Sequence, residues 1–212
     1  MAKVYIRAVR LGKWFPPNDA LAVQIARLCI LREDLMLQLH GLHAERIKAL
    51  DLHSTAYRRT YFLRSAVRTM WEIQGANTVI RSNPAFKKML AKCSPGDQRK
   101  LKEITRKLNA AAPLVQRLRN ALGGHVDTDY VAIALKEMEW ERFGFLEVGA
   151  RIKETHYQFA GELVAEMLVP GVPPSERYGQ LEKDMATIAG LLPIVQALEL
   201  IIATYAEARD LI

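Results

Sequence analysis

The feature that most constrains the fold is one apolar stripe between residues 98 and 122. Apolar side chains recur there at intervals of three or four residues, at Leu101, Ile104, Leu108, Ala111, Val115, Leu118 and Leu122. This spacing follows the 3.6-residue period of an α-helix that packs one face on a core. Pro113 lies inside the stripe, where we expect it to bend or split the helix. Gly123 and Gly124 are expected to end the helix.

Helical spacing continues through most of the chain. Further helices are predicted over 20–48, 54–81, 83–93, 128–138 and 153–168. A loop rich in Pro and Gly at 169–179 precedes a C-terminal helix pair at roughly 174–212, and one short β-hairpin is expected near 139–152. The sequence therefore predicts a mainly α protein, an antiparallel helical bundle that forms a single domain over residues 1–212.

The C-terminal helix carries a narrow apolar seam. Its members follow alternating spacings of four and three residues: Leu191, Val195, Leu198, Ile202 and Tyr205. Such a seam suits a single partner helix. The partner lies either inside the same fold or in a second copy of the chain.

Composition limits the class of protein. The chain has 212 residues, half of them hydrophobic, which is enough for one substantial core. No run of about 18 apolar residues occurs, and the first residues lack the apolar segment of a signal peptide. Cys29 and Cys93 stand apart without metal-ligand spacing, as is usual for thiols in a reducing compartment. We therefore expect a cytoplasmic protein with no membrane span.

Positive charge is concentrated in one segment. The chain carries a formal net charge of +7, and the segment 81–119 holds eleven basic residues against Asp97 and Glu103. Such a concentration indicates a polyanion as partner, RNA or DNA. The predicted RNA contacts are Lys100, Arg106, Lys107 and Arg117. The alternative is a solvated helix face without a ligand.

The stretch RLRNALGGHVDTDY at 117–130 places an Arg and a His around the two glycines. Arg119 and His125 are six residues apart, about 600° on a continuous helix, so they converge only if the helix stops between them. A cation, an imidazole and the free amides of the next helix would then suit a phosphodiester. The alternative is a helix C-terminus with basic residues at its negative end and a solvated His.

These residues resemble a known motif. RNALGGH is similar to the R-x(4–6)-H motif of the HEPN superfamily, with Asn120 as the polar residue that often follows the Arg. The preceding helix with YFLRSAVRTMWEI and the basic stretch after it fit the same pattern, and the resemblance covers roughly 54–138. It implies a HEPN-like helical bundle and frequent homodimerisation. For toxin-type members it also implies a nucleotidyltransferase-like antitoxin as partner.

The resemblance also implies a chemistry. Many members cleave RNA without a metal or another cofactor, with the Arg and His of the motif as catalytic residues. His125 would then move a proton, Arg119 would stabilise charge on the phosphoryl oxygens, and Asn120 would orient a group by hydrogen bonding. The ribose 2′-OH would be the attacking group. Other members keep the fold and only bind.

Two further groups of residues are candidates. Arg64, Arg68 and Glu72 form a strip at four-residue spacing, for which we expect an ordinary Arg68–Glu72 surface pair and a supporting or RNA-contact role. His40 and His43 lack a third ligand at metal-site spacing, so no metal is expected. Two hypotheses therefore remain: a HEPN-like RNA-binding protein, active as a metal-independent endoribonuclease, and a non-catalytic helical protein that acts through a protein partner or as a dimer.

Overall fold

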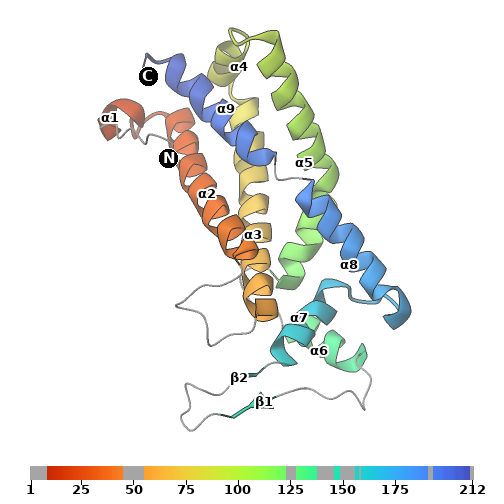
Figure 1. Ribbon diagram of the computed structural model, residues 1–212. Helices are drawn as coiled ribbons and strands as arrows, with labels where there is room; N and C mark the ends of the chain where they lie inside the picture. The colour runs from red at the N-terminus through yellow and green to blue at the C-terminus, as the bar shows by residue number, and fades with distance from the viewer. Residues whose placement is uncertain are drawn as a thin grey trace.

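The computed structural model describes residues 9–44, 55–122, 128–137, 146–148, 156–157, 159–190 and 193–210. Within these residues the protein is mainly α, and its helices pack as a bundle (Figure 1). The helices are α1 Leu11–Trp14, α2 Ala20–His43, α3 Thr55–Ser82, α4 Pro84–Leu90, α5 Pro95–Leu122, α6 Thr128–Glu137, α7 Phe159–Leu168, α8 Pro174–Ala189 and α9 Ile194–Glu207. Two short strands, β1 Leu146–Glu147 and β2 His156–Tyr157, form one antiparallel pair.

Local chemistry fixes where several helices begin. The carboxylate of Asp19 accepts hydrogen bonds from the backbone amides of Leu21 and Ala22, at 2.9 and 3.1 Å, and so caps α2. Asn83 caps α4 in the same way, with Pro84 at the first helical position. Ser94 accepts from the amide of Asp97 at 3.1 Å at the start of α5. These side chains satisfy amides that lack an intrahelical partner.

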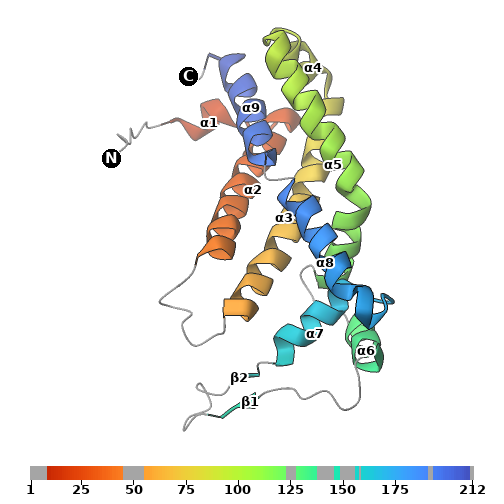
Figure 2. The same cartoon turned by 45° about the vertical axis from the view of Figure 1, so that its right-hand side comes forward.

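Helix α3 is the centre of the bundle. It packs against α2 on one side and α5 on the other, and α9 lies across α2 and α5 (Figures 1 and 2). The buried face of α3 includes Met70, Ile73 and Ile80, each 0–1% exposed. Helices α6 and α7 lie at the end of the bundle where α5 finishes, and α8 runs from there back towards α9 (Figure 2). Burial of these apolar faces is the main force that holds the helices together.

Helix α5 confirms the apolar stripe and excludes one of the two outcomes expected at Pro113, a split of the helix. Five members of the stripe are buried: Leu101, Leu108, Ala111, Val115 and Leu118. The helix runs from Pro95 through Pro113 to Leu122 as one element, so the proline does not split it. Pro113 and Asn109, whose carbonyl loses its amide partner, are both exposed. Water can therefore solvate that carbonyl, and the buried stripe on the opposite face holds the helix together.

The other predicted boundaries need small corrections. The helix predicted over 20–48 is α2, which ends earlier, at His43, and the helix predicted over 54–81 is α3. Residues 45–54 lie outside the described ranges. The helix predicted over 153–168 begins only at Phe159, because His156 and Tyr157 pair with β1. Most of the hairpin predicted near 139–152 is outside the described residues, and β2 lies beyond it. Pro174 opens α8 inside the predicted loop, as a proline in a first turn does.

The C-terminal helix pair is present as α8 and α9. The buried face of α9 is wider than the predicted seam, since Ile194, Ala197 and Ile201 are buried beside Leu198 and Tyr205. Val195 and Ile202 are only half-buried, and Leu191 is outside the described residues. Because α9 packs on α2 and α5, the apolar seam of α9 is part of the core of this chain.

Candidate functional site

The last turn of α5 presents an exposed arginine. The guanidinium carbon of Arg119 lies 5.8 Å from the ring centroid of Trp71 on α3, within the range of a cation–π contact. Its Nη1 donates to Oδ1 of Asn120 at 3.3 Å. Among the described residues, no carboxylate pairs with Arg119. The guanidinium therefore keeps donors available for an anion.

His125 lies outside the described residues, together with Gly123 and Gly124. Helix α5 ends at Leu122 and α6 begins at Thr128, so the described helices flank the segment that contains His125. The convergence of Arg119 and His125 stays a prediction.

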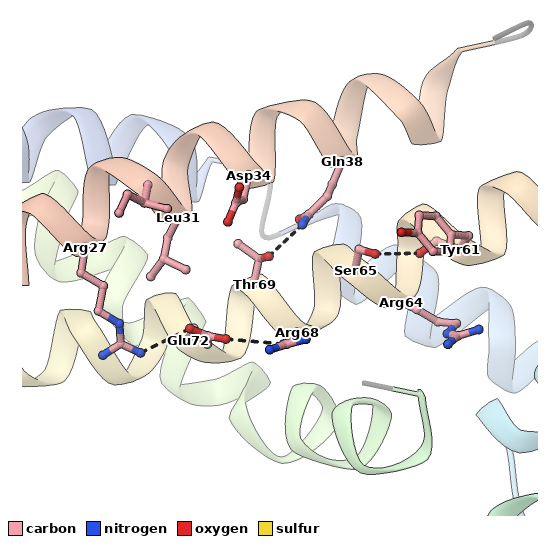
Figure 3. Close-up of a pocket in the computed structure, with 11 residues that line it drawn as sticks. Arg27, Leu31, Asp34, Gln38, Tyr61, Arg64, Ser65, Arg68, Thr69 and Glu72 are labelled. Carbon is pink, nitrogen blue, oxygen red and sulfur yellow. Dashed lines mark hydrogen bonds and ion pairs between the residues drawn. The ribbon is translucent and has the colours of Figure 1, made fainter. Parts of the chain in front are cut away.

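A pocket of about 520 Å³ lies between α2 and α3 (Figure 3). We call it the α2–α3 pocket. Its lining residues are Arg27, Ile30, Leu31, Asp34, Gln38, Tyr61, Arg64, Ser65, Arg68, Thr69 and Glu72. The amide Nε2 of Gln38 donates to the Thr69 hydroxyl at 2.9 Å and so links the two walls. The pocket combines guanidinium, carboxylate, hydroxyl and aromatic groups with an apolar wall.

A carboxylate sits between two of the arginines in this pocket. Oε2 of Glu72 lies 3.5 Å from Nη2 of Arg27, and Oε1 lies 3.5 Å from Nε of Arg68 (Figure 3). The Arg68–Glu72 pair is the i, i+4 surface pair that the sequence predicts. The contact from Arg27 comes from the neighbouring helix, and sequence spacing gives no sign of it. Both contacts are longer than a close charged hydrogen bond, which measures about 2.7–2.9 Å.

A second depression continues from this pocket towards α5. It measures about 410 Å³ and shares Arg27 and Glu72 with the α2–α3 pocket. Its other lining residues are Trp71, Gln74, Gly75, Thr78, Ala112 and Gln116. The two depressions are therefore neighbours along α3, and we refer to them together as the α3 groove. Trp71 lines this groove, and its ring also contacts the guanidinium of Arg119. The groove therefore reaches the end of α5.

The predicted RNA contacts on α5 do not gather beside Arg119. Lys100 and Lys107 line a depression against α9, with Asp97 and Glu103 within 4.0 and 3.1 Å of their ammonium groups. Arg106 is exposed on the outer side of α5. At about 100° per residue, a basic segment of one helix is spread around its whole circumference.

The side chain of Arg117 contacts two neighbouring helices, α7 and α8. It forms an ion pair with Asp184 on α8 and donates to the carbonyl of Leu168 on α7 at 3.1 Å. Gln180 donates to the other carboxylate oxygen of Asp184 at 2.8 Å. Arg117 therefore joins α5 to the two helices at the end of the bundle. It lies about 200° around α5 from Arg119.

The strip Arg64, Arg68 and Glu72 is the predicted group that does share one site, since all three line the α2–α3 pocket. Sequence reasoning missed Arg27, Asp34 and Gln38 on α2. A signal was available: these residues recur at helical spacing beside the buried stripe of α2 that contains Leu28 and Leu35. Which helix would face them depends on packing, which the spacing alone does not give.

The described residues offer little support for other kinds of site. They contain no cluster of three or more His, Cys, Asp or Glu side chains that could hold a metal ion, and this includes the surroundings of His40 and His43.

No helix in the described ranges has both the length and the apolar character needed to cross a membrane. Comparison of the chain with family models, curated proteins and solved structures finds no match.

Proposed function

We propose that this protein binds single-stranded RNA along the α3 groove and cleaves it without a metal at the end of α5. The observation that carries the proposal is the exposed guanidinium of Arg119, which rests on the Trp71 ring and has no carboxylate partner among the described residues. An arginine held in this way presents a planar fork of donors that matches a phosphate.

The groove supplies the other groups that a single strand needs. Arg68 is 60% exposed and Tyr61 is 52% exposed, and both lie on the pocket wall formed by α3. Guanidinium groups bind the phosphates, and an aromatic ring stacks on a base of any sequence. Single-stranded RNA offers unstacked bases to such a ring, whereas a duplex does not.

Cleavage follows from the motif chemistry. The imidazole of His125 takes the proton of a ribose 2′-OH, and the 2′ oxygen attacks the adjacent phosphorus. The bond from phosphorus to the 5′ oxygen then breaks, and the imidazolium returns a proton to that leaving oxygen. Arg119 stabilises the charge on the phosphoryl oxygens. An unperturbed imidazole titrates at about 6.5, which suits both proton transfers near neutral pH. The products are a 2′,3′-cyclic phosphate and a 5′-OH.

The test compares four proteins on a labelled single-stranded RNA in excess chelator: wild type, Arg119→Ala, His125→Ala and Arg99→Ala. Arg99 is the matched control, because it is an exposed arginine on the outer side of the same helix. We expect cleavage by wild type and Arg99→Ala, with a cyclic phosphate end, and none by the other two. Intact RNA with wild type in chelator would refute the catalytic part.

Binding is measured separately by fluorescence anisotropy. With about three phosphate contacts, affinity should fall roughly 20-fold between 50 and 200 mM salt. His125→Ala should keep this salt-sensitive binding, while Arg119→Ala should weaken it. If wild type binds no RNA at low salt, the whole proposal fails.

A second candidate function is supported by an exposed strip of α2 that borders the α2–α3 pocket at Ile30. Val23, Ile30 and Leu37 on α2 are 48–70% exposed and recur every seven residues. An exposed apolar strip with this period favours a helix of another protein or of a second copy. Sedimentation of wild type and Leu37→Glu tests this role. A larger species that dissociates in the variant would support it, and a wild-type monomer at tens of micromolar without a partner would exclude the dimer.

A further inference from the structure

We propose that the α2–α3 pocket binds one nucleoside phosphate unit, and that Glu72 occupies the phosphate position while the pocket is empty. In the setting of the proposed function, this unit is one nucleotide of the bound RNA, and the inference rests on that function. The pocket then takes one nucleotide of the strand, and the Glu72 carboxylate competes with the phosphate of that nucleotide for Arg27 and Arg68.

The competitor is identified by its geometry. The Glu72 carboxylate lies between Arg27 of α2 and Arg68 of α3, with one oxygen 3.5 Å from each guanidinium. This carboxylate contacts two arginines from two helices, and each contact, at 3.5 Å, is longer than a close charged hydrogen bond. A phosphodiester group has more acceptor oxygens and can give each arginine a short bond of about 2.7–2.9 Å. The exposed position of both guanidiniums allows a ligand to reach them.

The rest of the pocket fits a nucleoside. Tyr61 offers a half-exposed ring, and Ile30 and Leu31 form an apolar wall on α2. The exposed carboxylate of Asp34 turns towards the same space and can accept a hydrogen bond from a ribose hydroxyl or a base amino group (Figure 3). The volume of about 520 Å³ is within the usual range for small-ligand sites.

The first test removes the competitor. Glu72→Gln keeps the shape of the side chain and removes its charge, and we expect RNA to bind severalfold more tightly, with a steeper salt dependence. Glu33→Gln is the matched control, since Glu33 is an exposed acid of α2 that pairs with Arg32 and does not line the pocket. It measures the effect of net charge alone. The exposed pairs of Glu72 contribute little to folding, so the variant should fold.

The second test examines the base. Tyr61→Ala should weaken RNA binding roughly fivefold or more, the usual effect of losing one stacking ring. Tyr61→Phe, which keeps the ring, should recover most of that loss. Adenosine monophosphate and inorganic phosphate are added as competitors. We expect the nucleotide to compete at lower concentration than phosphate, and Tyr61→Ala to remove the difference.

The outcomes separate the two proposals. If wild type binds RNA but Glu72→Gln behaves like Glu33→Gln, or Tyr61→Ala binds like wild type, the pocket proposal is overturned and RNA binding stands. If wild type binds adenosine monophosphate through Tyr61 but binds no RNA, the pocket takes a free nucleotide and the RNA function is wrong. If neither ligand binds, both proposals are overturned.

Discussion

The Arg119 guanidinium lies over the indole ring of Trp71, with 5.8 Å between the guanidinium carbon and the ring centroid. This contact joins the last turn of α5 to the middle of α3, and thus joins the motif arginine to the α3 groove. A ring beneath a guanidinium restricts where it can lie without neutralising its charge, whereas a carboxylate partner would do both.

The first prediction concerns this contact. Trp71→Leu keeps an apolar side chain and removes the ring, so the unfolding free energy should lose about 0.5–1 kcal/mol of cation–π energy in addition to any packing loss. A double-mutant cycle with Arg119→Ala, measured by urea denaturation, isolates that amount as the coupling energy. A coupling energy of zero would show that the two groups do not interact in solution.

A second prediction compares two glycines. A Cβ at Gly41 would lie 2.5 Å from the Phe62 ring, so Gly41→Ala should destabilise the protein by about 1–3 kcal/mol through overpacking of α2 against α3. Gly75 lies inside α3, where an added Cβ would meet no neighbouring atom within 4 Å, so Gly75→Ala should stabilise by about 0.5–1 kcal/mol. Thermal unfolding of both variants measures the difference. Equal effects would contradict the close approach of the two helices at Gly41.

A third prediction concerns the ion pair between Arg117 and Asp184. The Asp184 side chain is only 11% exposed, so Arg117→Met leaves a buried carboxylate without its cation. The expected cost is about 3 kcal/mol, near the lower limit for broken buried pairs because Arg117 is partly exposed. Adding Asp184→Asn should recover part of the loss, as measured by chemical denaturation. A loss below about 0.5 kcal/mol, roughly the effect of an ordinary surface change, would contradict a buried pair.

A fourth prediction concerns the stability of the fold at low pH. Burial raises the pKa of Asp19, but the hydrogen bonds from Arg209 and from the amides of Ala22 and Leu21 outweigh it and hold that pKa below its ordinary value. A lowered pKa in the folded state stabilises the protein at pH values above the ordinary value of about 3.9, and this stabilisation is lost as the pH falls below it.

Asp19→Asn isolates that effect, because an asparagine still caps α2. At pH 6 the variant should be less stable by about 1.5–3 kcal/mol, the range for a hydrogen bond to a charged group. The difference between the two proteins should shrink as the pH falls from 5 towards 2. Denaturation curves across that range provide the measurement. A difference independent of pH would exclude the charge of Asp19 as its cause.

Much of the helical architecture could be predicted from local spacing. The stripe on α5 and the Arg68–Glu72 pair depend on residues a few positions apart on one helix, and both are present. Local rules failed where a distant segment intervened. His156 and Tyr157 leave the predicted helix because β1 pairs with them. At Pro113 the sequence left a bend and a split open, and the buried face opposite the proline keeps α5 one helix.

The candidate site shows the same limit. Arg64, Arg68 and Glu72 could be grouped from sequence, but Arg27 reaches Glu72 across 45 residues and Gln38 reaches Thr69 across 31. These contacts depend on how α2 is placed along α3, which the helical period does not determine. For the same reason, the basic residues of α5 looked like one track in the sequence but lie on several sides of the helix.

The position of α9 has a consequence for how the chain is made. The buried Tyr205 donates its hydroxyl to the carbonyl of Trp14, and Arg209 pairs with Asp19 across 190 residues. At 5–20 residues per second, a ribosome needs about 10–40 s to cover that distance. Until then the face of α2 that α9 will cover stays open to water. The bundle can close only after α9 has left the ribosome, so the α2 segment must wait for a partner that is made 190 residues later.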